Sequence, residues 1–174
     1  MYSKIRSKLN VSCQVSSVQE NGFIFLEIVI SVAIISIALV TFLGMAALAI
    51  NTSTTVKQVS KIDAYTKEEM EAVRSFRDGS TWATTGLGTA ITGIDYFMMF
   101  GGNPTAWALQ AGTETIDVFT RKVVFDQVSR DPVSGDIETT YNVGNDDPNT
   151  RKATVTITWG SKTYQTVTYF TNWQ

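Results

Sequence analysis

The sequence contains no histidine, and its only cysteine is Cys13. A chain without histidine has neither an imidazole base nor a histidine ligand for a metal ion, and a lone cysteine cannot form a disulfide within the chain. Its glycines form no phosphate-binding loop and no dinucleotide-binding fingerprint. We therefore expect that the protein is not an enzyme and that it uses no cofactor.

Proline is also rare, since the sequence contains three and none precedes Pro104. Proline breaks the interior of a helix, so its absence allows residues 23 to about 77 to form one long helix. The 23 residues from Ile28 to Ile50 carry no charge. A helix of about 20 apolar residues, at about 1.5 Å each, crosses a hydrocarbon core of about 30 Å, so residues 23–50 predict a transmembrane helix.

The second part of this helix, residues 51–78, is amphipathic. Its apolar residues recur with helical spacing and its charged residues lie mostly on other faces, which predicts a helix that covers a sheet with one side. The apolar stripe comprises Val56, Val59, Ile62, Tyr65, Met70, Val73 and Phe76. The pair Asp78-Gly79 supplies the stop signal for the helix.

The charge pattern places the chain relative to a membrane. The formal net charge is −2 and no basic patch stands out, so the charges do not support nucleic-acid binding. Lys4, Arg6 and Lys8 precede the apolar run, which predicts an N-terminus in the cytoplasm and a C-terminal domain outside. One acid, Glu27, lies near the start of the run, where an unpartnered carboxylate in lipid costs up to about 2.5–3.5 kcal/mol.

Gly22, Phe23 and Glu27 follow the basic segment at fixed spacing. This combination resembles the class III signal of type IV pilins and pseudopilins, in which a basic leader is cut after glycine. In that family the new N-terminus is usually phenylalanine, and a glutamate is the fifth residue of the mature chain. The resemblance implies that prepilin peptidase removes residues 1–22, that Phe23 is N-methylated and that Glu27 acts in assembly.

The resemblance also implies a role, partners and locations. The role is that of a structural subunit, a minor pilin or pseudopilin of a type IV pilus or type II secretion-like filament. The partners are prepilin peptidase, other pilin or pseudopilin subunits, the inner-membrane platform protein and the assembly ATPase. We expect the chain first in the cytoplasmic membrane and then in a cell-surface or periplasmic filament.

Electrostatic attraction explains the spacing between the cleavage site and Glu27. Cleavage before Phe23 creates an α-amine with an ordinary pKa of about 7.7–8.0, which is largely protonated at neutral pH. In a medium of low dielectric this ammonium attracts the Glu27 carboxylate of a neighbouring subunit strongly. The pair forms only after the leader is removed, so processing controls assembly.

Two other interpretations stay open. In the first, the apolar helix anchors a non-polymerising binding module that is displayed outside the membrane. In the second, Ala47-Leu48-Ala49 is the small-x-small site of a secretory signal. The apolar run is longer than the usual signal core of about 7–15 residues, and it begins beside Glu27, which is unusual in such a signal.

Gly44 is a further candidate for a role in assembly, because it lies where many pilins carry a helix-weakening proline. Glycine costs about 1 kcal/mol relative to alanine inside a helix, so Gly44 is a candidate weak point. Close packing of neighbouring helices is an equal explanation for a small residue there. Farther along, residues 71–78 (E-A-V-R-S-F-R-D) resemble the end of this helix in many pilin-like proteins.

Residues 79–116 form a Gly- and Thr-rich connector in which Gly101-Gly102-Asn103-Pro104 predicts the turn of a short hairpin. Residues 117–174 alternate between strand and turn patterns, and short turns make neighbouring strands antiparallel. The expected strands are residues 117–128, 137–143, 152–159 and 163–173. The chain is therefore expected to have an α+β fold, with the second half of the long helix packed on an antiparallel sheet. The pilin resemblance implies the same arrangement.

Acidic residues gather in two of the predicted turns, and carboxylates in loops can bind Ca²⁺. The resemblance allows this, because some secretion pseudopilins bind calcium. Neither turn has the ligand spacing of a known calcium loop, and aspartate is common in turns because it bonds to the backbone. We expect no metal site, and the weak calcium candidates are Asp131, Asp136, Asp146 and Asp147.

Overall fold

The computed structural model describes residues 18–102 and 105–173 and, of residues 18–22, the backbone alone. The chain groups into two compact units, Met1–Thr54 and Thr55–Gln174. Most of the predicted leader, including Cys13 and its three bases, lies outside the described residues, as do the last two residues of the predicted hairpin turn.

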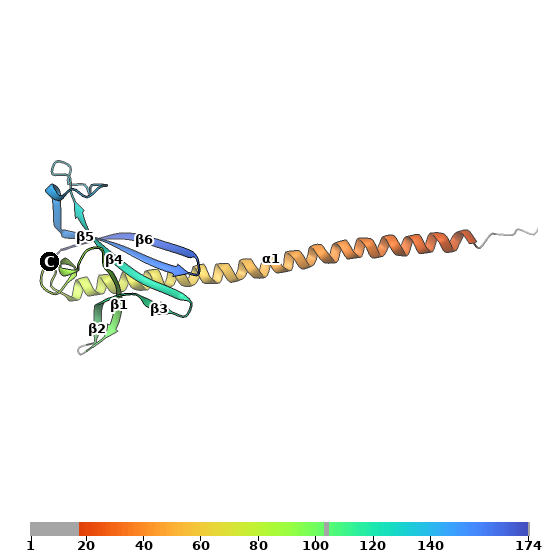
Figure 1. Ribbon diagram of the computed structural model, residues 1–174, viewed down its shortest axis with the longest axis horizontal. Helices are drawn as coiled ribbons and strands as arrows, with labels where there is room; N and C mark the ends of the chain where they lie inside the picture. The colour runs from red at the N-terminus through yellow and green to blue at the C-terminus, as the bar shows by residue number, and fades with distance from the viewer. Residues whose placement is uncertain (1–17, 103–104, 174) are drawn as a thin grey trace, which may run out of the picture. The chain divides into compact units, whose positions relative to one another are not determined.

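One helix, α1 (Val18–Gly79), accounts for 62 residues (Figure 1). It begins before residue 23, where the sequence predicted its start, and it ends at the predicted stop. The prediction of a single long helix is confirmed. Its residues contain no proline, and Ser80 adds a hydrogen bond from its hydroxyl to the Phe76 carbonyl at 2.6 Å, which satisfies one carbonyl of the last turn.

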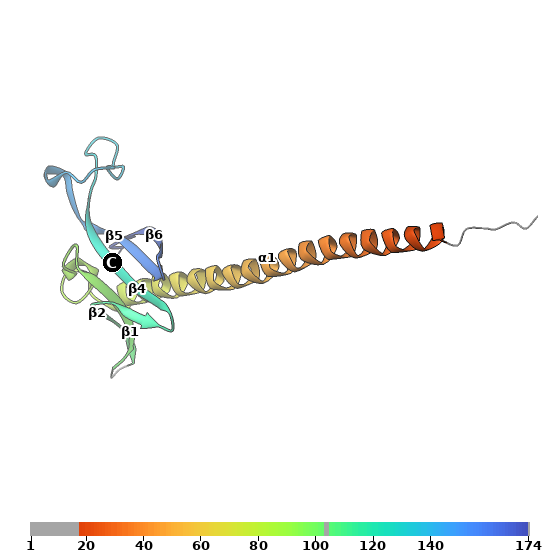
Figure 2. The same cartoon turned by 45° about the vertical axis from the view of Figure 1, so that its right-hand side comes forward.

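The second unit contains an antiparallel sheet of six strands in the order β2-β1-β4-β5-β6, with β3 paired to β4. The hairpin β1–β2 and the loop between β4 and β5 project to opposite sides of the sheet (Figures 1 and 2). The expected α+β class and the predicted hairpin are confirmed. The strands are β1 (Asp95–Gly101), β2 (Ala106–Ala111), β3 (Glu114–Ile116), β4 (Phe119–Ser129), β5 (Asp146–Trp159) and β6 (Lys162–Thr171), and the 3-10 turns are η1 (Leu87–Thr89) and η2 (Val143–Asn145).

The predicted strand at residues 137–143 is wrong. This segment is a loop that touches the sheet through a single bridge between Arg130 and Ile137. Its backbone bonds instead to the end of β4: the N–H of Glu138 donates to the Ser129 carbonyl at 2.9 Å, and the N–H of Asn142 donates to Ser129 Oγ at 2.9 Å. The Glu138 bond lies on the edge of β4 opposite β5, because the Ser129 carbonyl points away from the side on which the Arg130 N–H donates to the Asn145 carbonyl at the start of β5.

Two other strand predictions need correction. Residues 146–150, expected as a loop, form the start of β5, where the pairing with β4 shifts register between Gln127 and Ser129. A bulge of this kind bends the strand and accommodates Pro148, which has no N–H for the ladder. The sequence also missed the short β3, which is joined to β4 by a two-residue turn with Asp117 at φ 55°. Aspartate tolerates a positive φ better than most residues.

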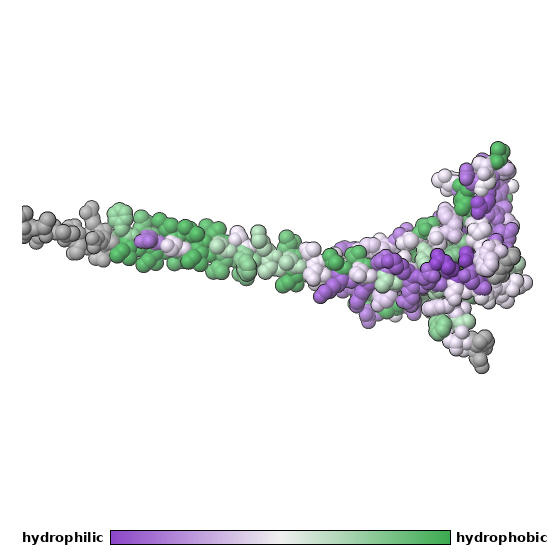
Figure 3. Space-filling model, turned by 180° about the vertical axis from the view of Figure 1, so that it is seen from behind, coloured by the Kyte–Doolittle hydropathy of each residue, from purple (hydrophilic) through white to green (hydrophobic). Residues whose placement is uncertain are grey.

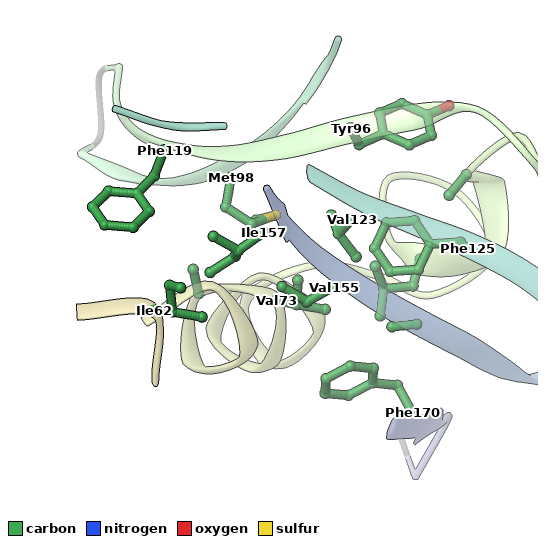
Figure 4. Packing of buried hydrophobic residues seen from close by; sticks show 14 of the residues in the cluster. Ile62, Val73, Tyr96, Met98, Phe119, Val123, Phe125, Val155, Ile157 and Phe170 are labelled. Carbon is green, nitrogen blue, oxygen red and sulfur yellow. The ribbon is translucent and has the colours of Figure 1, made fainter. Parts of the chain in front are cut away.

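The hydrophobic core lies between the second half of α1 and one face of the sheet (Figure 4). The helix contributes Ile62, Ala72 and Val73, so the prediction that its amphipathic half covers the sheet is confirmed. Val56 and Val59 belong to the same predicted stripe but are exposed. The sheet contributes Tyr96, Met98, Phe119, Val123, Phe125, Ala153, Val155, Ile157 and Phe170.

The segment that follows α1 is fixed to the beginning of β5. Trp82 is buried, and its Nε1 donates to the Pro148 carbonyl at 3.0 Å. The buried Arg151 guanidinium donates to the Gly88 carbonyl at 3.2 Å. A Cβ at Gly88 would lie 2.6 Å from the Trp82 carbonyl oxygen, so only glycine fits at this close approach.

The core predicts the effect of shortening one side chain of α1. Val73→Ala should destabilise the second unit by about 2 kcal/mol, because it leaves a cavity at a site with no exposure. The matched control is Val56→Ala, where valine is 61% exposed. It should change the free energy of unfolding by no more than about 0.5 kcal/mol. Denaturant unfolding followed by tryptophan fluorescence measures both, and equal effects would contradict this packing.

Candidate functional site

Phe23 and Glu27 lie on the part of α1 that belongs to the first unit. Four residues separate them, so their side chains lie on the same face of the helix, one turn apart. Both are exposed. Among the residues that the structure describes, none forms an ion pair with Glu27.

The surface around Glu27 is apolar. The large apolar side chains between Phe23 and Ile50 are between 48% and 74% exposed, and they cover almost the whole visible face of this part of the helix in Figure 3. The described part of the chain contains one helix that is long and apolar enough to cross a membrane. A helix that is apolar all round is normally covered by lipid or by other apolar helices.

Two of the three hydroxyl groups within this apolar run, those of Ser36 and Thr41, bond to the helix itself. Ser36 Oγ donates to the Val32 carbonyl at 2.7 Å, and Thr41 Oγ1 donates to the Ala38 carbonyl at 2.8 Å. These bonds satisfy the hydroxyl protons without water, which makes the polar residues compatible with a hydrocarbon environment. Glu27 is the one charged residue of this run, and the described part of the chain gives it no cation.

Gly44 shows no steric need for glycine within one chain. A Cβ at this position would meet no atom within 4 Å, and the helix continues through it. Its two suggested roles, a weak point or a site of close packing between helices, both concern an assembly and stay predictions.

Three of the four calcium candidates hold their carboxylates in hydrogen bonds or ion pairs with the protein. Asp131 Oδ1 accepts the N–H groups of Val133 at 2.7 Å and Ser134 at 3.0 Å, and these hydrogen bonds lower the pKa of the Asp131 carboxyl. Asp147 Oδ2 forms an ion pair with Arg130 Nε at 2.6 Å.

The other two candidates take part in the same turns. Asp146 Oδ1 accepts the Tyr141 hydroxyl at 3.1 Å, and the Asp136 carbonyl accepts the N–H of Asp131 at 2.9 Å. Within residues 23–102 and 105–173, no three Asp, Glu, His or Cys side chains come together in a group that could hold a metal ion.

The structure adds a buried charge cluster that the sequence did not reveal. Glu69 on α1 has no exposure and Arg121 on β4 is 3% exposed, and Arg121 Nε lies 3.0 Å from Glu69 Oε2. The same nitrogen donates to Glu114 Oε2 on β3 at 3.0 Å, and Arg121 Nη1 lies 3.4 Å from Glu68 Oε1. The N–H of Met98 on β1 donates to Glu69 Oε1 at 2.9 Å.

Burial raises the pKa of Glu69 to about 7, although Arg121 and the N–H of Met98 act to lower it. Glu114 and Glu68 raise it further, because one guanidinium is shared among three carboxylates. For Arg121, desolvation lowers the pKa, but the three acids outweigh it and leave the pKa raised. The group that titrates near neutral pH is therefore the glutamate between the helix and the sheet.

A signal for this cluster was present in the sequence. Glu69 falls on the apolar stripe of the helix, four residues after Tyr65 and four before Val73, where a charge is expected only with a partner. Arg121 lies two residues after Phe119 and two before Val123, so it shares their inner face of the strand.

No protein-family model, curated protein or solved structure matches the chain significantly. The first unit offers an exposed acid in an apolar helix, and the second offers a sheet joined to residues 55–79 of α1 by a buried charge cluster.

The raised pKa of Glu69 predicts a pH-dependent stability. Below about pH 4.5 the carboxyl is protonated in the folded and the unfolded chain. Between about pH 4.5 and 7 the unfolded chain releases this proton and the folded chain keeps it. The contribution of Glu69 to stability therefore falls as the pH rises through this window, on the order of 3 kcal/mol in total, and is constant above it.

Glu69→Gln tests this prediction, because glutamine can still accept the N–H of Met98 and cannot titrate. Relative to wild type, the variant should gain stability between pH 4.5 and 7, as measured by denaturant unfolding at several pH values. Glu71→Gln, on the exposed side of the same helix, should keep the wild-type dependence. Parallel pH profiles for wild type and Glu69→Gln would rule out this role of Glu69.

Proposed function

We propose that this protein is a structural subunit of a type IV pilin-like filament, a minor pilin or pseudopilin, which prepilin peptidase cuts after Gly22. The observation that carries the proposal is an exposed carboxylate, Glu27, one helical turn from Phe23 and surrounded by the exposed apolar side chains of residues 23–50. Residues 23–50 hold the subunit in the cytoplasmic membrane until assembly and then pack with the helices of other subunits.

The need to neutralise Glu27 supports this proposal. An isolated carboxylate in a medium of low dielectric is costly, and no cation of the described chain pairs with it. The α-ammonium that cleavage creates on Phe23 of a neighbouring copy is a charge of the right sign at a fixed place. N-methylation of Phe23 keeps that charge, so it preserves the pair.

The second unit supports the same proposal less directly. An amphipathic half-helix packed on an antiparallel sheet is the arrangement that the pilin resemblance implies. A subunit that packs its apolar half-helix into a filament needs a separate folded part that stays in water. Assembly of this kind requires the platform protein and the ATPase as partners.

A second candidate is a membrane-anchored binding module that does not polymerise. It is favoured by an open pocket of about 430 Å³ in the second unit, which such a module can use to hold a ligand. The two candidates differ in the state of the N-terminus, because only the filament subunit requires cleavage.

The first test of the proposed function is the mass of the protein after expression with a prepilin peptidase. The mature chain should begin at Phe23 and carry one additional methyl group on its amine. Mass spectrometry of the intact protein and of its N-terminal peptide measures both. A Gly22→Asp variant, changed only at the cleavage site, should keep the leader. Wild-type protein that retains residues 1–22 would favour the anchored module.

A second test removes the acid. Glu27→Ala should leave membrane insertion intact, because it removes a charge that costs up to about 2.5–3.5 kcal/mol in lipid. Its incorporation into filaments should fall at least tenfold, since the neighbouring ammonium loses its partner. Immunoblots of membrane and sheared-filament fractions measure the two quantities.

Glu71→Ala, which removes an exposed carboxylate from the same helix outside the apolar run, is the matched control. It should be incorporated as well as wild type. Wild-type incorporation of Glu27→Ala would contradict the pairing of Glu27 with the ammonium.

A further inference from the structure

The open pocket of about 430 Å³ lies on the face of the sheet that α1 does not cover. Phe125, Ala153 and Phe170 point into the core from three adjacent strands. Their chain neighbours Asp126, Lys152 and Tyr169 therefore lie on the opposite face, because successive side chains of a strand alternate. These three residues are aligned across β4, β5 and β6 and form one side of the pocket.

The loop between β4 and β5 forms another side. Glu138, Thr139 and Tyr141 from this loop line the pocket. The loop is held to the end of β4 by the two hydrogen bonds to Ser129, so these side chains are presented by a fixed backbone. The volume falls in the range of about 300–1,000 Å³ that is usual for small-molecule sites.

The polar groups of the pocket include donors and acceptors with free capacity. Lys152 Nζ lies 3.7 Å from Asp126 Oδ2, which is too far for a hydrogen bond, so both groups can bond to a ligand. Glu138 Oε1 accepts the Asn145 amide at 2.8 Å, while its Oε2 is buried and has no hydrogen-bond partner among the described residues. A donor brought by a ligand would relieve this unpaired oxygen after a small rotation of the carboxylate.

The charges argue against two classes of ligand with different strength. An anion would meet two carboxylates, Asp126 and Glu138, against one ammonium. A cation would be attracted by these two carboxylates, but it would have to displace the ammonium of Lys152 from Asp126. A ligand with hydroxyl groups has neither problem, because each hydroxyl donates one hydrogen bond and accepts others, and so it fits a pocket that mixes both kinds of partner.

Two tyrosine rings add an apolar surface. Tyr141 is 41% exposed and Tyr169 is 46% exposed, and both line the pocket. An aromatic ring that is apolar on its face and polar at its hydroxyl suits a ligand that has both characters. Sugar rings have this character, with C–H groups on their faces and hydroxyls at their rim. We infer that this pocket binds an uncharged saccharide, with one or two rings in contact with Asp126, Glu138, Lys152 and the two tyrosines.

This inference does not depend on the proposed function. The pocket is formed by residues of the second unit and includes none of the residues of the cleavage site or the apolar helix. It applies to a filament subunit and to an anchored module alike, so its failure would leave the processing and assembly tests unchanged.

The test uses the full chain in a detergent without a sugar headgroup and four uncharged probes: maltose, cellobiose, lactose and N,N′-diacetylchitobiose. Saturation-transfer NMR should show contact with at least one of them, and titration of that sugar gives its affinity. Choline and inorganic phosphate are the cationic and anionic probes, and both should show no contact.

Matched variants locate the site. Tyr169→Ala should weaken binding at least fivefold, whereas Thr163→Ala, on the same face of β6 outside the pocket, should leave it unchanged. Lys152→Met should weaken binding at least threefold, and its control is Lys122→Met. Lys122 is exposed to a similar degree on the same sheet face and is bonded to Asp95 outside the pocket. Thermal unfolding of each variant confirms that it is folded.

Three outcomes would overturn the inference. The first is no contact with any of the four sugars. The second is sugar binding that Tyr169→Ala and its control change equally. The third is binding of choline or phosphate in place of the sugars, and stronger choline binding by Lys152→Met would identify a cation site.

Discussion

One guanidinium joins the helix to the sheet, and the position of the second half of α1 on the sheet depends on it. Arg121 from β4 lies against Glu69 from α1 and Glu114 from β3, and Glu69 in turn accepts an N–H of β1. Apolar side chains alone permit a helix to slide along a sheet, since contact between them has little directional preference. A buried ion pair adds little net stability, but it is costly to break and so selects one register.

Glu27 and Glu69 are the same residue type in opposite situations. Glu69 lies between helix and sheet, and the fold supplies both a cation and a backbone donor. Glu27 lies on an exposed apolar helix, and the described chain supplies no cation for it. The fold thus supplies a counter-charge to Glu69, and the described residues supply none to Glu27. This asymmetry is the physical reason to expect that the first unit functions in an assembly or in lipid.

Features that depend on neighbouring residues were predicted correctly from the sequence, and a pairing between distant residues was not. The long helix, the hairpin around Gly101 and the strand pattern after Lys152 depend on local features, namely the absence of proline, turn residues and periodicity, and all three were predictable. The charge cluster was not, because Glu69 and Arg121 are far apart in sequence and only the fold brings them together. Their two positions on apolar faces were visible, but the pairing was not.

The error at residues 137–143 has the same origin and a further consequence. The segment has the composition of a strand, but it pairs with β4 only at Arg130, on the edge opposite β5, and remains a loop attached through Ser129. As a loop it holds Glu138 and Tyr141 across from Asp126 and Tyr169. The place where local pattern and fold disagree is therefore the place where the pocket forms, and such disagreements are expected at functional sites.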